Sequence, residues 1–315
     1  MSFEAKDIVP VEYQSIFTVL SPIEKMGILK IVKKEFEEIE DKYIRLFKSL
    51  EEYLTRYKDE DISELTFIMS GQIAHDLQKK EFIDRMLDIY PKSPELQYFK
   101  TLQQVDKGQF ENIDELIEKI RLADEERNRI FTRLVSANRL AAIILDLQSF
   151  SLEMTYYNAK EDYSEIEKLY EKTEQIWKET LKWTKDKPIL FLQEIIVRLI
   201  TQYTQYLLSA KNLDTALNYF EDPEIQEILN LVESNITKAN ILHVGATLYF
   251  NVGQPHKAIK QMEEAINIIE KVHGRKEWKA TVYHSYAYML NLIDKDKCIE
   301  AFEKCYQLAK GTQDY

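Results

Sequence analysis

Apolar positions recur at steps of three and four residues along most of the chain, a spacing that predicts amphipathic helices rather than strands. The first long run begins at Ser21-Pro22, a helix cap followed by a first-turn proline. A polar stretch, Asp59 to Ser63, closes it. The apolar positions of this run form a heptad-like stripe: Leu29, Val32, Phe36, Ile39, Tyr43, Leu46, Leu50, Tyr53 and Tyr57.

This N-terminal stripe has two interpretations. A dimerising coiled coil would bury it against a second copy of the chain. The interpretation that we favour is one long helix, or two consecutive helices, whose apolar face packs on the helices that follow. The first 60 residues are therefore expected to form an N-terminal helical segment, which could serve in dimerisation or in binding an effector.

The clearest repeated unit begins at Asn240. Ala246 and Tyr249 share one face of a first helix, Gly253 supplies a turn, and a second helix follows with small and bulky residues alternating on one stripe. This is the pattern of a tetratricopeptide unit, two antiparallel helices A and B of about 34 residues. The stripe residues of the second helix are Ala258, Met262 and Ala265.

Weaker copies of this pattern flank that unit, at variable spacings. Pro91 and Pro94 end the earliest helix pair, around Phe67 to Tyr90. The residues that mark the other copies are, toward the C-terminus, Tyr286, Met289, Cys298, Phe302 and Cys305, and, toward the N-terminus, Leu207, Ala216, Phe220, Tyr157, Tyr163, Ile166, Tyr170, Gly108, Phe110, Ile113, Ile117 and Ile120.

These copies predict an all-α fold, a right-handed superhelical solenoid of antiparallel helix pairs of the tetratricopeptide-like (TPR-like) type. We assign residues 1–60 to the N-terminal segment and residues 61–315 to the repeat domain. Because the spacing is irregular, a HEAT-like arrangement of the helix pairs stays open.

Composition supports long helices with short turns, since the 315 residues include only seven Gly and seven Pro. The formal net charge of −12 opposes duplex DNA as the main partner, because phosphate binding needs clustered Lys and Arg. No stretch has the length and hydropathy of a membrane-spanning helix, and the start of the chain does not resemble a signal peptide. We expect a cytoplasmic protein with no membrane partner.

Catalytic motifs are absent from the sequence: it contains no phosphate-binding glycine loop, zinc-binding HExxH helix, paired CxxC or nucleophile elbow. The five histidines are scattered. We therefore predict a protein that is not an enzyme and has no cofactor, catalytic residue or metal site. Cys298 and Cys305, seven positions apart in a helical stretch, are too distant for a disulfide and are expected to pack.

The A helices of such repeats line a concave surface, so the template positions on that face predict where a ligand binds. These positions carry mainly amides and hydroxyls, which donate to and accept from an extended peptide backbone. An alternative is that the amides are solvated or bridge neighbouring helices. The candidate peptide-binding residues are Gln148, Asn158, Arg198, Gln202, Gln205, Asn240, His243, Thr247 and Tyr283.

A basic cluster lies on one predicted helix near the middle of the chain. Guanidinium groups form planar bidentate contacts with carboxylates, so the cluster could anchor an acidic group of a ligand. The simpler interpretation is an exposed face paired with neighbouring acids. Its members are Arg121, Arg127, Arg129, Arg133 and Arg139.

The degenerate repeats from Ile62 to Gly311, with their Tyr- and Asn-rich A helices, follow the stretch FTVLSPIEKMGILKIVKKEF. Together these features resemble the TPR peptide-receptor superfamily of bacteria and phages, the Rap, Rgg, PlcR and arbitrium (AimR-type) receptors, and the arbitrium receptors most. The resemblance implies a short signalling peptide held on the concave face, and a quorum-sensing or lysis–lysogeny role. It also implies a change of curvature that alters a protein or DNA partner.

The chain departs from most of that superfamily because no N-terminal helix-turn-helix is evident. Three functions stay open: a peptide-responsive regulatory receptor that acts on a protein effector, a constitutive adaptor without a peptide ligand, and a DNA-binding regulator with a diverged DNA-binding element. A homodimer is expected for any of them.

Overall fold

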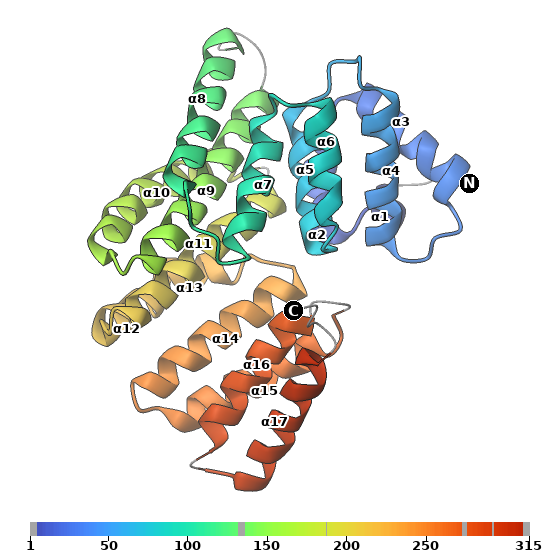
Figure 1. Cartoon of the computed structure of the whole chain (residues 1–315). Coiled ribbons are helices and arrows are strands. Elements are labelled where there is room, and N and C mark those ends of the chain that lie inside the picture. Colours follow the sequence, from blue (N-terminus) through green and yellow to red (C-terminus); the bar gives the residue numbers. More distant parts are fainter. Residues whose placement is uncertain (1–4, 132–135, 187, 273–275, 292, 311–315) are drawn as a thin grey trace. The chain divides into compact units, whose positions relative to one another are not determined.

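The computed structural model describes residues 5–131, 136–186, 188–272, 276–291 and 293–310, and within these ranges every regular element is a helix (Figure 1). The helices group into two compact units, residues 1–195 and 196–315, whose boundary falls within helix α11. Residue 60, where we placed the end of the N-terminal segment, lies inside the first unit.

Unit 1 begins with short helices and continues with longer ones. Its helices are α1 (Ala5–Ile8), α2 (Val11–Val19), α3 (Pro22–Ile31), a π-helical turn η1 (Val32–Phe36), α4 (Lys42–Arg56), α5 (Glu64–Asp76), α6 (Lys80–Ile89), α7 (Pro94–Val105), α8 (Ile113–Phe131), α9 (Ser136–Ala159) and α10 (Tyr163–Trp183), and α11 (Leu190–Ser209) starts in it. From α5 onward they form the pairs α5/α6, α7/α8 and α9/α10.

The N-terminal stripe forms two consecutive helices, α3 and α4, rather than one. Leu46, Leu50 and Tyr53 on α4 are buried within unit 1, and α4 packs on α5. The favoured interpretation is therefore correct, and these residues are not free to form the seam of a coiled coil. The predicted cap is also present: the Ser21 hydroxyl accepts from the backbone N–H of Glu24, and the Glu24 carboxylate accepts in return from that of Ser21.

Glu24 does more than cap its own helix. Its side chain is buried, and its second carboxylate oxygen accepts from the backbone N–H of Ser63 at 2.9 Å and from the hydroxyls of Ser63 and Thr66 at 2.8 and 2.9 Å. One carboxylate thus holds the N-termini of α3 and α5 together, where the exposed backbone N–H groups favour negative charge.

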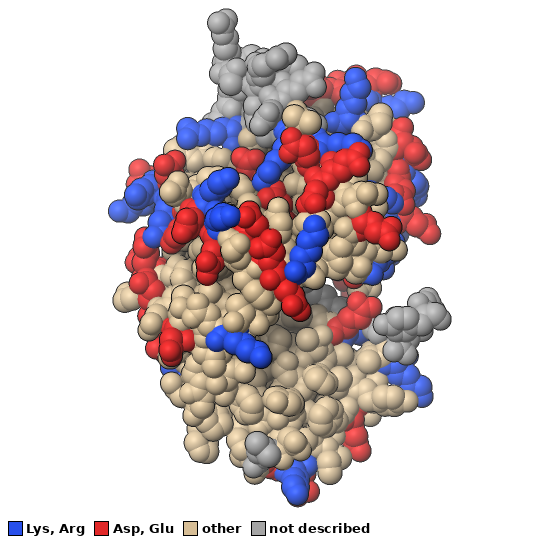
Figure 2. Space-filling view, turned by 60° about the vertical axis from the view of Figure 1, so that its left-hand side comes forward, with Lys and Arg blue, Asp and Glu red and all other residues tan. Residues whose placement is uncertain are grey.

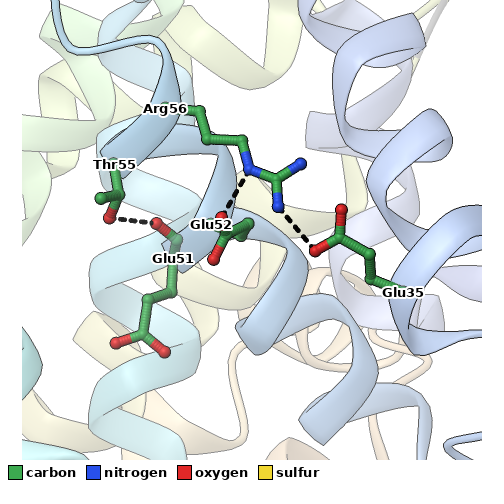
Figure 3. Close-up of polar contacts among 5 residues, drawn as sticks. All are labelled: Glu35, Glu51, Glu52, Thr55 and Arg56. Atoms are coloured by element: carbon green, nitrogen blue, oxygen red, sulfur yellow. Dashed lines mark hydrogen bonds and ion pairs between the residues drawn. The ribbon is translucent and has the colours of Figure 1, made fainter.

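The π-helical turn η1 is joined to α4 by an ion pair between Glu35 and Arg56. Figure 3 shows Arg56 between two acids: its Nη2 lies 2.7 Å from Glu35 of η1, and its Nε lies 2.5 Å from Glu52 of α4. The hydrogen bond from Arg56 lowers the pKa of Glu35. All three side chains are partly exposed, so this cluster orients η1 relative to α4 more than it adds to the stability of the fold.

Unit 2 contains the most regular repeats. Its helices are the second half of α11, α12 (Leu213–Phe220), α13 (Pro223–Leu229), α14 (Asn235–Asn251), α15 (Pro255–Ile269), α16 (Lys276–Leu290) and α17 (Lys295–Ala309), and the pairs α14/α15 and α16/α17 pack closely. In the α14/α15 pair, Ala246, Ala258, Met262 and Ala265 are all completely buried. The predicted unit is confirmed residue by residue.

The last pair differs from its prediction on one side. Cys298 of α17 is buried as expected, and Cys305 is half-buried; both thiols are free. Ala301 is buried in the core of the pair, whereas Phe302 is 43% exposed. The Phe302 ring still meets the ring of His284 on α16 edge to face, with centroids 5.9 Å apart, so Phe302 packs within the pair only in part.

Five of the turns between paired helices share one backbone conformation. Gly253 (φ 78°) and Gly108 (φ 69°) provide it with glycine, as expected. In the other three turns a residue other than glycine adopts this left-handed conformation. In all five turns, the backbone N–H of the residue that follows the left-handed residue donates to a carbonyl five positions earlier. The non-glycine residues are Gln78 (φ 56°), Glu161 (φ 58°) and Lys211 (φ 59°).

Candidate functional site

The A helices of unit 2 carry few charged side chains. Between residues 196 and 209 the only charged residue is Arg198, α14 carries only Lys238, and residues 280–291 carry none. The B helices α15 and α17 are rich in Lys and Glu. The lower part of Figure 2, where Figure 1 shows unit 2, presents a face with few charges. Such a surface suits an uncharged polar ligand.

Three contacts join these A helices along one face. The Asn240 amide of α14 donates to the hydroxyl of Thr201 on α11 at 3.3 Å. His243 Nε2 of α14 lies 3.0 Å from the Ser285 hydroxyl of α16. Two turns further along α14, the Phe250 ring meets the ring of Tyr288 on α16 edge to face, with centroids 5.8 Å apart. We call this surface of α11, α14 and α16 the A-helix face.

Arg198 and Gln205 are the exposed members of the A-helix face on α11, two helical turns apart. The buried residues on either side of Arg198 fix its backbone, since Val197 and Leu199 are both inaccessible to solvent. Arg198 carries an exposed guanidinium on a rigid helix, one turn after the buried Glu194 of the same helix, and this group can bind a carboxylate.

His243 is a packing residue rather than an exposed ligand contact. Its side chain is buried, and burial lowers the pKa of His243 to about 4. The imidazole is therefore neutral at pH 7 and shares a hydrogen bond with Ser285. Asn240 is half-buried and bridges two helices, so these two residues position the face, whereas Arg198 and Gln205 present groups to solvent.

Thr247 and Gln202 lie at the edge of the same surface, and both are half-buried. The Thr247 hydroxyl donates to the carbonyl of His243 at 2.9 Å, which leaves its oxygen able to accept. The Gln202 amide donates to the hydroxyl of Tyr206 on its own helix.

Tyr283 belongs to a different surface from the one we predicted. Its hydroxyl donates to Glu270 at the end of α15 at 2.6 Å, so it lies at the junction between consecutive helix pairs. The A-helix position of α16 is occupied by Ser285 and by the exposed Tyr288 instead. Ser285 and Tyr288 meet α14 at His243 and Phe250, which lie 42 and 38 positions earlier, so no single spacing relates the two helices.

Gln148 and Asn158 lie on α9, in unit 1. Gln148 is 3% exposed, and neither its amide nitrogen nor its amide oxygen has a hydrogen-bond partner among the described residues. Asn158 is half-buried, with its amide oxygen enclosed. Because Gln148 lies in the core of its unit, it is not available to a ligand at the surface.

The basic cluster is only partly described. Arg121 forms an ion pair with the buried Glu153, whose pKa burial raises, and lies over the ring of Phe150. Arg139 lies over the ring of Trp183, 5.1 Å from its centroid. These two guanidinium groups are used in packing and pairing within unit 1. The side chains of Arg127, Arg129 and Arg133 lie outside the described residues.

Within the described ranges, no three His, Cys, Asp or Glu side chains gather as a metal-binding group. None of the described helices combines the length and hydropathy needed to cross a bilayer.

Comparison with solved structures shows the fold. A crystal structure of the anaphase-promoting-complex hetero-tetramer Cut9–Hcn1 matches with a TM-score of 0.55 at 9% identity, over 95% of this chain and 54% of that one. This chain thus spans about half the length of that relative. BtubC (BKLC) from P. vanneervenii matches at 13% identity with a TM-score of 0.49, over 81% of this chain and 94% of that one.

A putative kinesin light chain with nearly identical TPR-like repeats, from Podospora anserina, matches at 15% identity with a TM-score of 0.44, over 71% of this chain and 99% of that one. No protein-family model and no curated protein sequence matches this chain. The chain is an all-α, TPR-like repeat solenoid, and the comparisons establish that architecture alone.

Proposed function

We propose that this protein is a peptide-responsive regulatory receptor that binds an extended peptide on the A-helix face of unit 2. The observation that carries the proposal is the chemistry of that face: Arg198, Gln205, Thr247 and Tyr288 offer one cation, an amide, hydroxyls and an aromatic ring. An extended peptide needs paired donors and acceptors for its backbone and a cation for its terminal carboxylate.

The TPR-like fold and the resemblance to Rap-, Rgg- and arbitrium-type receptors support a regulatory role. In this role the bound peptide stabilises one arrangement of the helix pairs, and that arrangement alters binding to a protein partner in the cytoplasm. Binding must differ between two arrangements to have this effect, by a free energy of about 1–3 kcal/mol for a typical coupling. A homodimer is compatible with this role.

The test is selection of linear peptides from a random phage-displayed library on the full-length chain, followed by calorimetric titration of the synthesised peptides. We expect Arg198→Ala to weaken binding of a peptide with a free C-terminal carboxylate about tenfold or more, and to matter little for the amidated form. Lys260→Ala, on the exposed side of α15, is the matched control. Equal affinity of the wild type and the Arg198→Ala and Asn240→Ala variants would refute the assignment.

A constitutive adaptor is the second candidate function, since the same fold holds protein partners without a peptide signal. The direct bridges of Asn240 to Thr201 and of His243 to Ser285 favour it, because they already fix neighbouring A helices to each other. An adaptor would bind its protein partner equally with and without the selected peptides, whereas a receptor would not.

A further inference from the structure

The junctions between consecutive helix pairs in unit 2 repeat one set of polar contacts, in which a glutamate meets a tyrosine hydroxyl and a lysine. Glu221, the residue that ends α12, accepts from the Tyr249 hydroxyl at 3.0 Å and from Lys257 at 2.9 Å, both of the next pair. On α15, Glu263 accepts from the Tyr286 hydroxyl at 3.0 Å and lies 3.6 Å from Lys297 of the following pair.

Glu270, which ends α15, repeats the arrangement with Tyr283 at 2.6 Å and Lys304 at 3.7 Å. Each of these three glutamates therefore accepts a hydrogen bond from a tyrosine hydroxyl of the next A helix and pairs with a lysine of the next B helix. Tyr283 pairs with the end of α15 and Tyr286 with its middle, so the covering helix α16 runs antiparallel to α15.

Helix α17 repeats this surface of α15, and no further helix pair packs on it within the described residues. The two helices begin at Pro255 and Lys295, and the junction lysines Lys257 and Lys297 stand in the same register, 40 positions apart. In this register Met262 corresponds to Phe302. Met262 is completely buried, whereas Phe302 is 43% exposed and meets only the His284 ring of α16 among the ring contacts of the described residues.

The neighbouring apolar positions behave in the same way. Ile259 and Ile266 on α15 are half-buried, and their counterparts Ile299 and Tyr306 on α17 are 57% and 66% exposed. These three residues, Ile299, Phe302 and Tyr306, follow one another at helical spacing and form one apolar stripe, which we call the α17 stripe. Single exposed apolar residues are ordinary, but a contiguous stripe at an interface position indicates a partner.

The charges beside the α17 stripe specify that partner further. Glu303 stands in the register of Glu263, the acid that receives a tyrosine hydroxyl and a lysine. Lys310, which ends α17, occupies the position that corresponds to Glu270 on α15, and it carries the opposite charge. A helix laid antiparallel on α17 as α16 lies on α15 must therefore offer an acid to Lys310 and, three residues later, a hydroxyl or ammonium donor to Glu303.

We infer that the α17 stripe is the docking site for an amphipathic helix of a partner protein, with an apolar face flanked by the pattern Asp/Glu-x-x-Tyr/Lys. The docked helix extends the stack by one A-type helix and covers the exposed parts of Ile299, Phe302 and Tyr306. This surface is separate from the A-helix face, so the inference stands whether or not that face binds a peptide.

The test uses a probe taken from the chain itself. A fluorescein-labelled synthetic peptide of residues 276–290, the sequence of α16, is prepared unchanged and with Tyr283→Glu, which supplies the acid for Lys310. Both are titrated into the full-length chain and followed by fluorescence anisotropy. We expect the Glu variant to bind about threefold to tenfold more tightly than the unchanged peptide, the range of a partly exposed ion pair.

Three protein variants locate the bound peptide. Phe302→Asp is expected to weaken binding of the Glu variant at least about tenfold, because it places a charge under the apolar face. Glu303→Lys is expected to weaken it about fivefold, and a second change in the peptide, Tyr286→Glu, is expected to restore the loss. Glu264→Lys, the same charge reversal at an exposed site on α15, is the matched control and is expected to have no effect.

Several results would overturn the inference. These are no binding of the Glu variant at 1 mM peptide, equal binding to the wild type and to Phe302→Asp, and equal losses from Glu303→Lys and Glu264→Lys. Sedimentation of the chain alone supplies a further check: a dimer that Phe302→Asp dissociates would assign the α17 stripe to a second copy instead of a partner helix. Circular dichroism is expected to show that Phe302→Asp keeps the fold, although it removes the ring contact with His284.

Discussion

The two units use polar groups in different ways. Unit 1 concentrates them: the buried Glu24 serves two helix ends, and Arg121 neutralises the buried Glu153. Unit 2 distributes them, with Glu221, Glu263 and Glu270 each repeating one modest junction at the surface. A repeated junction can be added or removed together with one repeat without disturbing the other junctions. A single central group such as Glu24 cannot be removed in this way. Removing one polar group should therefore damage unit 1 more than unit 2.

The largest expected effect is that of Glu24→Ala. It removes the acceptor for two backbone N–H groups and three hydroxyls, of which the Thr66 hydroxyl is on a buried residue. Orphaned buried donors cost about 1–3 kcal/mol each, so we expect a loss of about 3 kcal/mol or more in the free energy of unfolding of unit 1.

Urea denaturation measures the loss for Glu24→Ala, and hydrogen exchange shows whether it stays in α3 to α5. The exposed Glu38 offers a matched control, because Glu38→Ala is expected to change stability by less than about 0.5 kcal/mol. A similar cost for both substitutions would contradict the concentrated role of Glu24.

Acid is expected to weaken unit 2 through His243. Its pKa is about 4 in the folded chain and near the ordinary 6.5 in the unfolded chain, so the unfolded state binds the proton first as the pH falls. Stability is therefore complete above pH 6.5, declines between pH 6.5 and 4, and is lower by at most about 3 kcal/mol below that window.

Urea titrations of wild type and His243→Gln at pH 7.5 and pH 5 measure this contribution. Glutamine keeps a donor for Ser285 but does not titrate, so its stability should change less between the two pH values. The exposed His256, also in unit 2, provides the control, and the dependence should survive in His256→Gln. A wild-type pH response in His243→Gln would contradict the assignment.

Because the turns share one left-handed conformation, replacing a turn glycine with alanine and replacing a turn lysine with glycine should change stability in opposite directions. Gly253→Ala places a Cβ at φ 78° and is expected to cost about 1 kcal/mol. Lys211→Gly removes a Cβ from φ 59° and is expected to gain up to about 0.5–1 kcal/mol, less the greater freedom of glycine in the unfolded chain. Thermal unfolding of both variants checks the signs, and a destabilised Lys211→Gly would show that the side chain itself is needed.

The smallest expected effect separates α15 from α17. Glu263→Ala loses its contacts with Tyr286 and Lys297 and is expected to destabilise unit 2 by about 1 kcal/mol, the cost of one partly exposed hydrogen-bonded pair. Glu303→Ala, in the same register on α17, is expected to change stability by less than about 0.5 kcal/mol in the isolated chain. Equal losses would mean that α17 is covered in the same way as α15.

The sequence predicted the helices and most repeats because small residues such as Ala246 and Ala258 mark where two helices approach closely. It did not predict the division of the chain within α11, since the apolar pattern of that helix is continuous. It also misplaced Tyr283, because periodicity defines a face of one helix but not the register between two helices. Burial of Gln148 depends on neighbouring helices and could not be read from α9 alone.

For the site, the sequence correctly indicated that amides and hydroxyls dominate the A helices of unit 2. Whether an amide faces solvent, as Gln205 does, or reaches a neighbouring helix, as Asn240 does, depends on distances between helices that spacing along the chain does not encode. The α17 stripe was similarly hidden, because Phe302 fits the apolar pattern of a buried position.

The left-handed turn at Gln78, Glu161 and Lys211 has a consequence for how such chains diverge. What each turn needs is a backbone angle and a returning hydrogen bond, and several residue types supply both at a cost of about 1 kcal/mol. Mutation can therefore replace the glycine that a repeat signature requires while the helix pair persists. A lineage built from such turns can lose its recognisable signature long before it loses its architecture.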